Sequence, residues 1–179
     1  MIYMFISEGF EEIEALCPLD LIRRAGLDIK TVGIGGEYVT GAHGITVKTD
    51  MTDAEYPCDT ADMIFLPGGM PGTLNLAASD AVIGAIKKAL DDGSYIAAIC
   101  AAPSILGDMG ILNGKKAVCY PGFEDRLTGA EVLNEKVVLD GKILTAKGMG
   151  AALDMGLRIV EIFRGADAAV ALRHAVIAD

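Results

Sequence analysis

The sequence predicts an α/β fold in which a doubly wound, mainly parallel sheet carries helices on both faces. Short runs rich in Ile and Val alternate with longer segments of helical period along the whole chain, and this alternation is typical of parallel βαβ units. Hydrophobic residues make up 52% of the chain and charged residues 22%, a balance typical of a folded globular protein. The length of 179 residues, without a repeat or a linker, favours a single domain over residues 1–179.

The first half of the chain is expected to alternate strand and helix. Residues 1–6 are a short apolar strand, and residues 10–26 follow a helical period that ends in basic residues and Gly26, a common helix stop. Residues 28–34 are the second strand. Residues 38–50 are expected to form two short strands around a glycine-containing turn.

The second half continues this pattern. Residues 61–69 hold an apolar strand that ends in a glycine loop, and a helix follows at 79–93. The next strand is expected at 95–99, before a helix at 101–110 and a further strand at 115–121. A hairpin with an Asp-Gly turn is expected at 136–146. Two helices, at 150–165 and 167–178, end the chain's predicted elements.

Charge and hydropathy exclude two classes of partner. The net charge is −10, which argues against nucleic acid and against an anionic membrane surface, because both need a basic protein face. The apolar runs are too short to cross a membrane. The first ten residues lack the basic segment and cleavage site of a signal peptide, so a cytoplasmic location is expected.

The cysteines and histidines indicate neither a disulfide framework nor a metal site. The four cysteines are widely spaced and form no CxxC pair, so reduced thiols are expected. His43 and His174 are the only histidines, and neither has a metal-ligand neighbour at a useful spacing. We therefore expect no metal and no cofactor.

Cys100 is the first candidate for catalysis. It lies at a corner between a predicted strand and a predicted helix, in the loop 98–103, "AICAAP", and ligands bind beyond the carboxyl ends of the strands in such sheets. A corner of this kind forces a side chain outward, as in the nucleophile elbow of hydrolases. The adjoining helix N-terminus favours a thiolate, so a reactive cysteine of low pKa is expected. The alternative is a buried, inert cysteine.

A second loop with unusual chemistry leaves the same edge of the sheet. It is "LPGGMPG", residues 66–72, in which Gly68 is expected to line the pocket. The backbone N–H of Gly69, together with that of Ala101, could form an oxyanion site. A plain turn and a phosphate cradle are the alternatives, although no GxGxxG or P-loop pattern is present.

Glu14 is the candidate acid. It heads a helix stripe that continues through Pro18, Leu21 and Ala25, because residues three and four apart share a helix face. A carboxyl on this otherwise apolar stripe would be partly buried and biased toward its protonated form, which could donate a hydrogen bond to a thiolate. The alternative is a partly exposed glutamate that interacts with the helix dipole. Pro18 is expected to kink the helix or to mark an irregular turn.

Three motifs together resemble a known family over essentially the whole chain. The segments "EGFEEIEAL…DLIRRAG", "LPGGMPG" and "AAICAAPSIL" stand in the order and spacing of the ThiJ/PfpI superfamily. The resemblance is to the branch of the Parkinsonism-associated deglycase (DJ-one) and its bacterial relatives. It implies a flavodoxin-like fold and a homodimer.

The resemblance also implies roles for individual residues. Cys100 would be the nucleophile and Glu14 its protonated hydrogen-bond partner. Gly69 and Ala101 would supply the oxyanion N–H groups. Arg24 would line an anion-binding spot beside the cysteine.

Four positions depart from the family pattern. Protease-like members carry a histidine directly after the cysteine, whereas Ala101 stands here, which argues against a peptidase. The human member has a histidine where this chain has Tyr120. His43 aligns with an arginine that reaches the partner's pocket, and it makes that basic group weaker and pH-dependent. In the loop 148–151, Met149 makes the pocket wall more apolar.

Two functions compete for this site. In the first, the thiolate adds to a reactive carbonyl such as methylglyoxal and Glu14 shuttles protons to yield a hydroxy acid, a cofactor-independent glyoxalase reaction related to deglycation. In the second, the protein is a non-catalytic redox sensor or chaperone, switched when Cys100 oxidises to sulfinate. No residue supports a role in thiamine metabolism, and the downstream His and Glu pair of a glutamine amidotransferase is not found.

Overall fold

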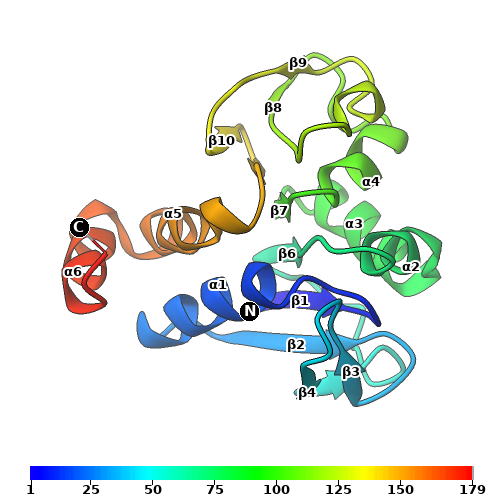
Figure 1. The fold of residues 1–179 in the computed structure, drawn as a ribbon, viewed down its shortest axis with the longest axis horizontal. Coiled ribbons are helices and arrows are strands. Elements are labelled where there is room, and N and C mark those ends of the chain that lie inside the picture. Colours follow the sequence, from blue (N-terminus) through cyan, green and yellow to red (C-terminus); the bar gives the residue numbers. More distant parts are fainter. Residues whose placement is uncertain (179) are drawn as a thin grey trace.

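A mainly parallel sheet forms the centre of the structure, a computed structural model that describes residues 1–178 (Figure 1). Within those residues the largest sheet has seven strands in the order β10-β11-β7-β6-β1-β2-β5. The strands are β1 (Ile2–Ile6), β2 (Ile29–Gly33), β5 (Met51–Thr52), β6 (Met63–Leu66), β7 (Tyr95–Ile99), β10 (Val137–Asp140) and β11 (Ile143–Ala146). Neighbours pair in parallel except β10 and β11, which form an antiparallel hairpin.

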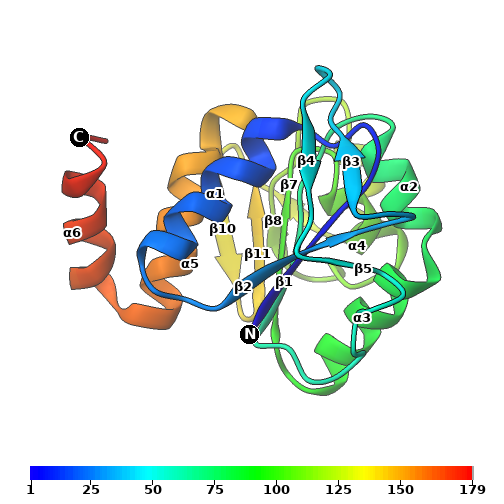
Figure 2. The same ribbon diagram turned by 90° about the horizontal axis from the view of Figure 1, so that it is seen from below.

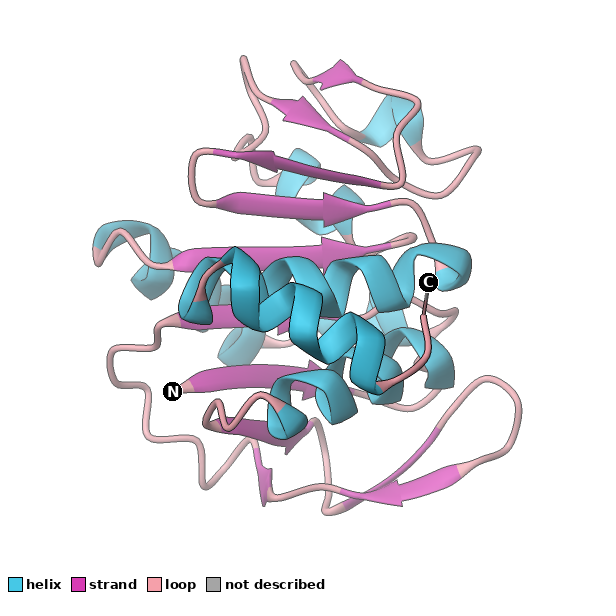
Figure 3. Ribbon diagram, turned by 90° about the vertical axis from the view of Figure 1, so that its left-hand side faces the viewer, coloured by secondary structure: helices cyan, strands magenta, loops and turns pink. Residues whose placement is uncertain are grey.

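Helices cover both faces of this sheet, as Figures 2 and 3 show. On one face α1 (Glu12–Arg24) packs against α5 (Ala152–Arg164), and α6 (Ala166–Ala175) packs on the outer side of α5. The other face carries α2 (Gly72–Ala78), α3 (Asp80–Asp91) and α4 (Pro103–Asp108). Among the described residues, no helix combines the length and apolar character needed to cross a bilayer.

Smaller elements flank the carboxyl ends of the central strands. Strands β3 (Tyr38–Thr40) and β4 (Thr46–Lys48) pair as an antiparallel hairpin. A short parallel pair joins β8 (Lys116–Ala117) and β9 (Glu131–Val132). Two 3-10 turns, η1 (Glu124–Arg126) and η2 (Met149–Ala151), complete the structure.

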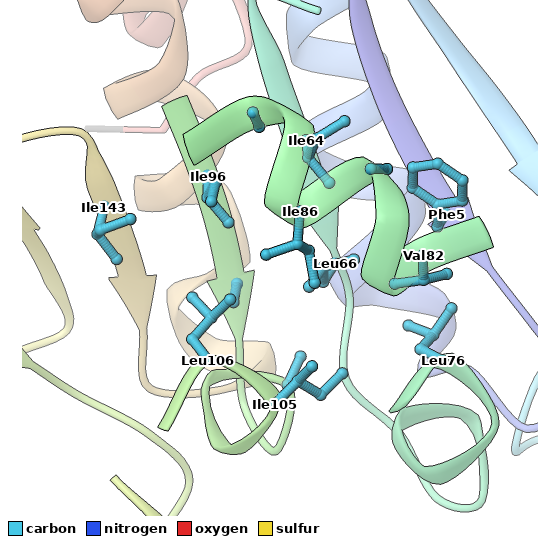
Figure 4. Packing of buried hydrophobic residues seen from close by; sticks show 14 of the residues in the cluster. Phe5, Ile64, Leu66, Leu76, Val82, Ile86, Ile96, Ile105, Leu106 and Ile143 are labelled. Carbon is cyan, nitrogen blue, oxygen red and sulfur yellow. The ribbon is translucent and has the colours of Figure 1, made fainter. Parts of the chain in front are cut away.

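The hydrophobic core lies in two layers, one on each face of the sheet. Along β1, Phe5 belongs to the layer under α3, whereas Met4 belongs to the layer under α1 and α5, because successive side chains of a strand point to opposite faces. Figure 4 shows the first layer, in which Ile86 of α3 lies over Ile64 and Leu66 of β6. Each buried side chain of this size stabilises the fold by about 1.5–3 kcal/mol.

The predicted α/β fold is confirmed, and the differences lie around the strand ends. The glycine loop runs directly into α2, which the sequence analysis did not expect. The predicted strand at 115–121 shortens to β8 because later backbone donors bond elsewhere: Val118 N–H donates to Thr145 Oγ1 at 3.0 Å and Tyr120 N–H to Cys100 O at 2.8 Å. The first helix continues through Pro18 without a break.

Candidate active site

Cys100 lies at a strained corner directly after β7. Its φ is 65°, a left-handed conformation that non-glycine residues adopt rarely. Neighbouring segments hold the corner, because Cys100 N–H donates to Ala146 O at 2.9 Å and Tyr120 N–H donates to Cys100 O at 2.8 Å. The end of β11 and the segment after β8 therefore fix the orientation of the thiol. This geometry agrees with the nucleophile elbow expected from the sequence.

Glu14 reaches the same point from the first turn of α1. The residue is only 1% exposed, and its carboxyl is hydrogen bonded to the Cys100 thiol. The backbone N–H of Gly68 donates to Glu14 Oε2 at 3.0 Å. A Cβ at Gly68 would lie 2.5 Å from Glu14 Oε2 and 2.6 Å from Cys100 Cβ. A glycine is therefore needed where the loop after β6 passes between the acid and the thiol.

The carboxyl of Glu14 and the thiol of Cys100 titrate as a coupled pair. Burial is the main cause that raises the pKa of the Glu14 carboxyl to about 7, and the hydrogen bond with Cys100 opposes that rise. Burial, followed by the charge of Glu14, raises the pKa of the Cys100 thiol to about 12. Since such a pair titrates as a unit, it loses one proton near neutral pH and the second far above it. Between these limits, the form with the proton on Glu14 carries a thiolate at Cys100.

This result changes one expectation and supports another. The raised pKa of Glu14 agrees with the protonated acid that its apolar stripe predicts. A low pKa for Cys100 from its corner position alone is wrong, because burial outweighs the hydrogen bonds that favour the thiolate. A reactive thiolate at neutral pH therefore depends on Glu14 keeping the proton.

Two backbone N–H groups point at the sulfur. Those of Ala101 and Gly69 donate to Cys100 and lower the pKa of its thiol. Gly69 has a φ of 95°, and a Cβ there would lie 2.3 Å from Glu11 N. The loop can take this path only with glycine. Both N–H groups that the sequence analysis assigned to an oxyanion site thus lie at the sulfur.

A cavity of about 620 Å³ opens over the thiol, within the range of small-molecule sites. Its walls are mainly apolar and are formed by Glu11, Glu14, His43, Cys100, Tyr120, Pro121, Lys136, Lys147, Gly148, Met149, Gly150 and Ala151. Tyr120 and Met149 are half exposed at this wall, as expected for pocket residues. A three-carbon carbonyl compound would leave much of this volume free.

The two predicted basic residues lie in different places. His43 lines the cavity of its own chain, at the turn of the β3–β4 hairpin. Arg24 lies in the last turn of α1, where it forms an ion pair with Asp20 at 2.6 Å, and it is not among the residues that line the cavity. Within one chain, the structure therefore does not bring Arg24 to the anion-binding position that the resemblance implies.

Three charged residues of the cavity were missed by the sequence analysis. Glu11 is the N-cap of α1, and its carboxylate accepts from Glu14 N–H at 2.7 Å. Lys136 and Lys147 flank the β10–β11 hairpin. The position of Lys147 could have been predicted from strand order. Lys147 directly follows β11, which pairs in parallel with β7. Because the carboxyl ends of neighbouring parallel strands meet at one edge of the sheet, Lys147 lies near the end of β7, where Cys100 follows.

One group of side chains could hold a metal ion among the described residues. Ligand atoms of Glu11, Glu12 and His43 lie within 4.8 Å of one another. Hydrogen bonds already engage all three side chains, because His43 Nδ1 lies 2.8 Å from Glu12 Oε2. Glu12 is hydrogen bonded to the hairpin turn at His43, and Glu11 caps α1.

Comparison with known proteins places the chain in a family. The family model described as DJ-1/PfpI matches residues 1–162. The chain belongs to the DJ-1/PfpI family. Protein DJ-1 homolog B of Arabidopsis thaliana is 35% identical over 168 residues, which are 92% of this chain but only 38% of that protein. This chain is thus similar to a part of that longer relative.

Members of similar length carry functional names. The glutathione-independent glyoxalase DJR-1.2 of Caenorhabditis elegans is 33% identical over 160 residues, 88% of this chain and 85% of that protein. A deglycase of Thermococcus kodakarensis is 32% identical over 147 residues, 80% of this chain and 87% of that protein. Among solved structures, oxidised DJ-1 of Toxoplasma gondii has a TM-score of 0.94 at 31% identity, over 98% of this chain and 97% of that one.

Proposed function

We propose that this DJ-1/PfpI member is a cofactor-independent glyoxalase, with related deglycase activity, that acts on small reactive carbonyl compounds such as methylglyoxal. One observation carries the proposal: a buried acid, Glu14, is hydrogen bonded to the Cys100 thiol on the wall of a ligand-sized cavity. The similarity to a glutathione-independent glyoxalase and to deglycases supports it.

Addition is the first step. The Cys100 thiolate attacks the aldehyde carbon, so that a sulfur–carbon bond forms and the carbonyl π bond breaks. The N–H groups of Gly69 and Ala101, which lie at the sulfur, stabilise the developing oxyanion. Glu14 gives its proton to that oxygen, and a hemithioacetal results.

Isomerisation and hydrolysis follow. Ionised Glu14 removes the proton from the carbon bonded to sulfur and returns it to the former ketone carbon, while a proton moves between the two substrate oxygens. This gives a 2-hydroxyacyl thioester. Water then cleaves the thioester into a 2-hydroxy acid and the thiol of Cys100, and one proton transfer between the thiol and Glu14 restores the starting pair. The sum is methylglyoxal plus water to lactic acid, without a redox cofactor.

Turnover tests this proposal directly. Methylglyoxal is supplied without glutathione, and lactate is measured for the parent protein, Cys100→Ser and Cys58→Ser. Cys58 is exposed and lies outside the cavity, so its variant is a matched control and should retain parental turnover. Cys100→Ser should form no lactate above background. Lactate formation by Cys100→Ser at the parental rate would contradict the proposal.

A redox role of the same cysteine is the second candidate. The two N–H groups at the sulfur and a protonated Glu14 are donors suited to a sulfinate, which forms when the thiol consumes two equivalents of hydrogen peroxide and releases two of water. A protein with only this role, as sensor or chaperone, would oxidise at Cys100 but fail the lactate assay. A peptidase role is not proposed, because Ala101 follows the cysteine.

We propose in addition that the protein is a cytoplasmic homodimer. Exposed apolar side chains support a second copy as the partner: Ile13 lies on α1, and Tyr38 and Ile45 lie on or beside the β3–β4 hairpin. The four cysteines are free thiols, which suits a reducing compartment.

A further inference from the structure

The carboxylate of Glu12 is buried beside the cavity but has no part in the chemistry proposed above. Its side chain is 3% exposed. Glu12 Oε1 accepts from the backbone N–H of His43 at 2.7 Å and of Ile45 at 3.4 Å. Glu12 Oε2 lies 2.8 Å from His43 Nδ1. The first turn of α1 therefore binds both the backbone and the ring of one hairpin residue.

The hairpin turn is built to keep this contact. A Cβ at Gly41 would lie 2.4 Å from Glu12 Cδ, so only glycine lets the carboxylate approach. Ala42 N–H donates to Phe10 O at 2.8 Å, and Gly41 N–H donates to Ile45 O at 3.0 Å. The turn is thus fixed against the segment that leads into α1.

These contacts leave one edge of the His43 ring for a ligand. Nδ1 faces Glu12, whereas Nε2 has no hydrogen-bond partner within residues 1–178. The side chain is 69% exposed and lines the cavity that also contains Cys100 and Glu14. A carboxylate that orients a histidine through one ring nitrogen, so that the other meets the substrate, recurs in catalytic sites.

Charge favours the imidazolium form of this ring. The hydrogen bond and charge of Glu12 raise the pKa of His43 above its ordinary value, and Glu11 adds to the rise. Glu14 also faces the cavity from α1, while Lys136 and Lys147 line it from the β10–β11 hairpin. The two acids of α1 that act on His43 thus favour its charged form, whereas the positive charges of the two lysines in the cavity wall disfavour it.

We propose that His43 is a catalytic residue, a cationic hydrogen-bond donor from Nε2 to the ketone oxygen of a dicarbonyl substrate, and that Glu12 is the positioning residue that aims it. The inference rests on the proposed glyoxalase function. In the isomerisation step that oxygen becomes an enediolate, so a donor aimed at it binds the transition state more tightly than the substrate. His43 transfers no proton in this role.

Kinetics over a range of pH test the pair. Turnover of methylglyoxal is compared for the parent, His43→Gln, His43→Arg and Glu12→Gln. The control is His174→Gln, which changes the chain's other histidine, a residue that does not line the cavity. His43→Gln should lower kcat by about 10- to 100-fold, somewhat less than the loss of an enclosed oxyanion donor. His43→Arg should retain most of kcat, because it keeps a cationic donor.

The pH profile separates a substrate donor from a structural role. In the parent, kcat/KM should fall as pH rises through the His43 pKa, since the imidazole loses its charge. His43→Arg should lack this limb, and Glu12→Gln should move it to lower pH. In the His174→Gln background His43 is the only histidine, so its ring resonance measures the same pKa by NMR and should also move down in Glu12→Gln.

Two results would overturn the inference. One is a His43→Gln variant whose kcat lies within twofold of the parent and whose pH profile is unchanged. The other is a His43 resonance whose pKa is the same with Glu12 and with Gln at that position. Failure of the proposed glyoxalase function would give a different result. In that case the parent protein would make no lactate, or Cys100→Ser would make as much lactate as the parent.

Discussion

The buried carboxyl of Glu14 is hydrogen bonded to the thiol of Cys100, although one residue lies in α1 and the other follows β7. Gly68 completes the contact with a backbone N–H at 3.0 Å from Glu14 Oε2. The pair holds one proton between its two ionisations. The position of that proton decides whether a thiolate is present at neutral pH.

Replacement of Glu14 by leucine tests where the shared proton resides. Glu14→Leu keeps the bulk and removes the donor, so Cys100 must ionise alone in a buried site. We expect the thiolate signal near neutral pH to disappear, because burial alone keeps the thiol of Cys100 protonated there. Turnover should fall by at least 100-fold, the usual contribution of a general acid or base. Ultraviolet thiolate absorbance titrated across pH measures the first effect. A thiolate signal near neutral pH as strong in the variant as in the parent would mean that Glu14 does not hold the shared proton, and its proton-shuttle role would have to be withdrawn.

The same acid makes folding stability depend on pH. Burial raises the folded pKa of Glu14 from the ordinary 4.5 to about 7, so between these values the native state binds a proton that the unfolded chain releases. The free energy of unfolding contributed by this group therefore falls as pH rises from about 4.5 to about 7. The change is at most about 3.5 kcal/mol, from ~1.4 kcal/mol per pKa unit.

Glu14→Gln removes this titration and is the matched variant. Denaturant midpoints are compared for parent and variant at both ends of the pH window. The variant should gain stability relative to the parent as pH increases. If the difference in denaturant midpoint between parent and variant were the same at both pH values, the carboxyl of Glu14 would titrate in the native state as it does in the unfolded chain.

Gly68 should tolerate no side chain. In Gly68→Ala the new Cβ would lie 2.5 Å from Glu14 Oε2 and 2.6 Å from Cys100 Cβ, so the acid and thiol must separate. We expect turnover to fall by about 100-fold, because displacement of reacting groups by an ångström has effects of that order. The control is Gly84→Ala in α3, where no atom lies within 4 Å of the added Cβ. That variant should keep parental turnover and gain up to about 1 kcal/mol of stability.

Peroxide should oxidise Cys100 before the other cysteines. Burial raises the thiol pKa of Cys17, Cys119 and Cys100 alike, so the pKa does not single out Cys100. Cys100 differs because its sulfur has Glu14 and the N–H groups of Gly69 and Ala101 as hydrogen-bond partners. Cys58 is exposed but lacks an acid and N–H donors that stabilise an oxidised sulfur. Mass analysis of peptides after mild peroxide treatment should show sulfinate at Cys100 first. Equal modification of all four thiols would contradict this order.

The proposed homodimer can be checked by light scattering. A mass twice that of the 18.7 kDa chain is expected at micromolar concentration. Ile13→Glu or Ile45→Glu should shift the mass toward the monomer, because an uncompensated charge would be buried in the interface. Lys87→Glu, an exposed change on α3, is the control and should leave the mass unchanged. A monomer mass for the parent protein at this concentration would contradict the proposed homodimer.

Local patterns in the sequence predicted the fold and marked Cys100 and Glu14 as candidates for the site. Alternating apolar runs and helical periods predict a parallel sheet, because burial on both faces demands apolar strands and amphipathic helices. The strand-to-helix corner marks Cys100, and the apolar stripe of α1 marks Glu14. Both signals are local, so they can be read without knowledge of which segments meet.

Tertiary structure decided the proton balance and the rest of the cavity wall. The depth of burial around Cys100, which raises the pKa of its thiol, depends on packing from β11 and from the loop after β6. Glu12 reads as a solvent-facing residue of α1 in the sequence, yet the β3–β4 hairpin covers it and supplies its hydrogen-bond donors. Arg24 ends in an ion pair on its own helix. Burial and long-range contact set these properties, because the energy of a charge depends on every segment that excludes water from it, and sequence spacing does not record those segments.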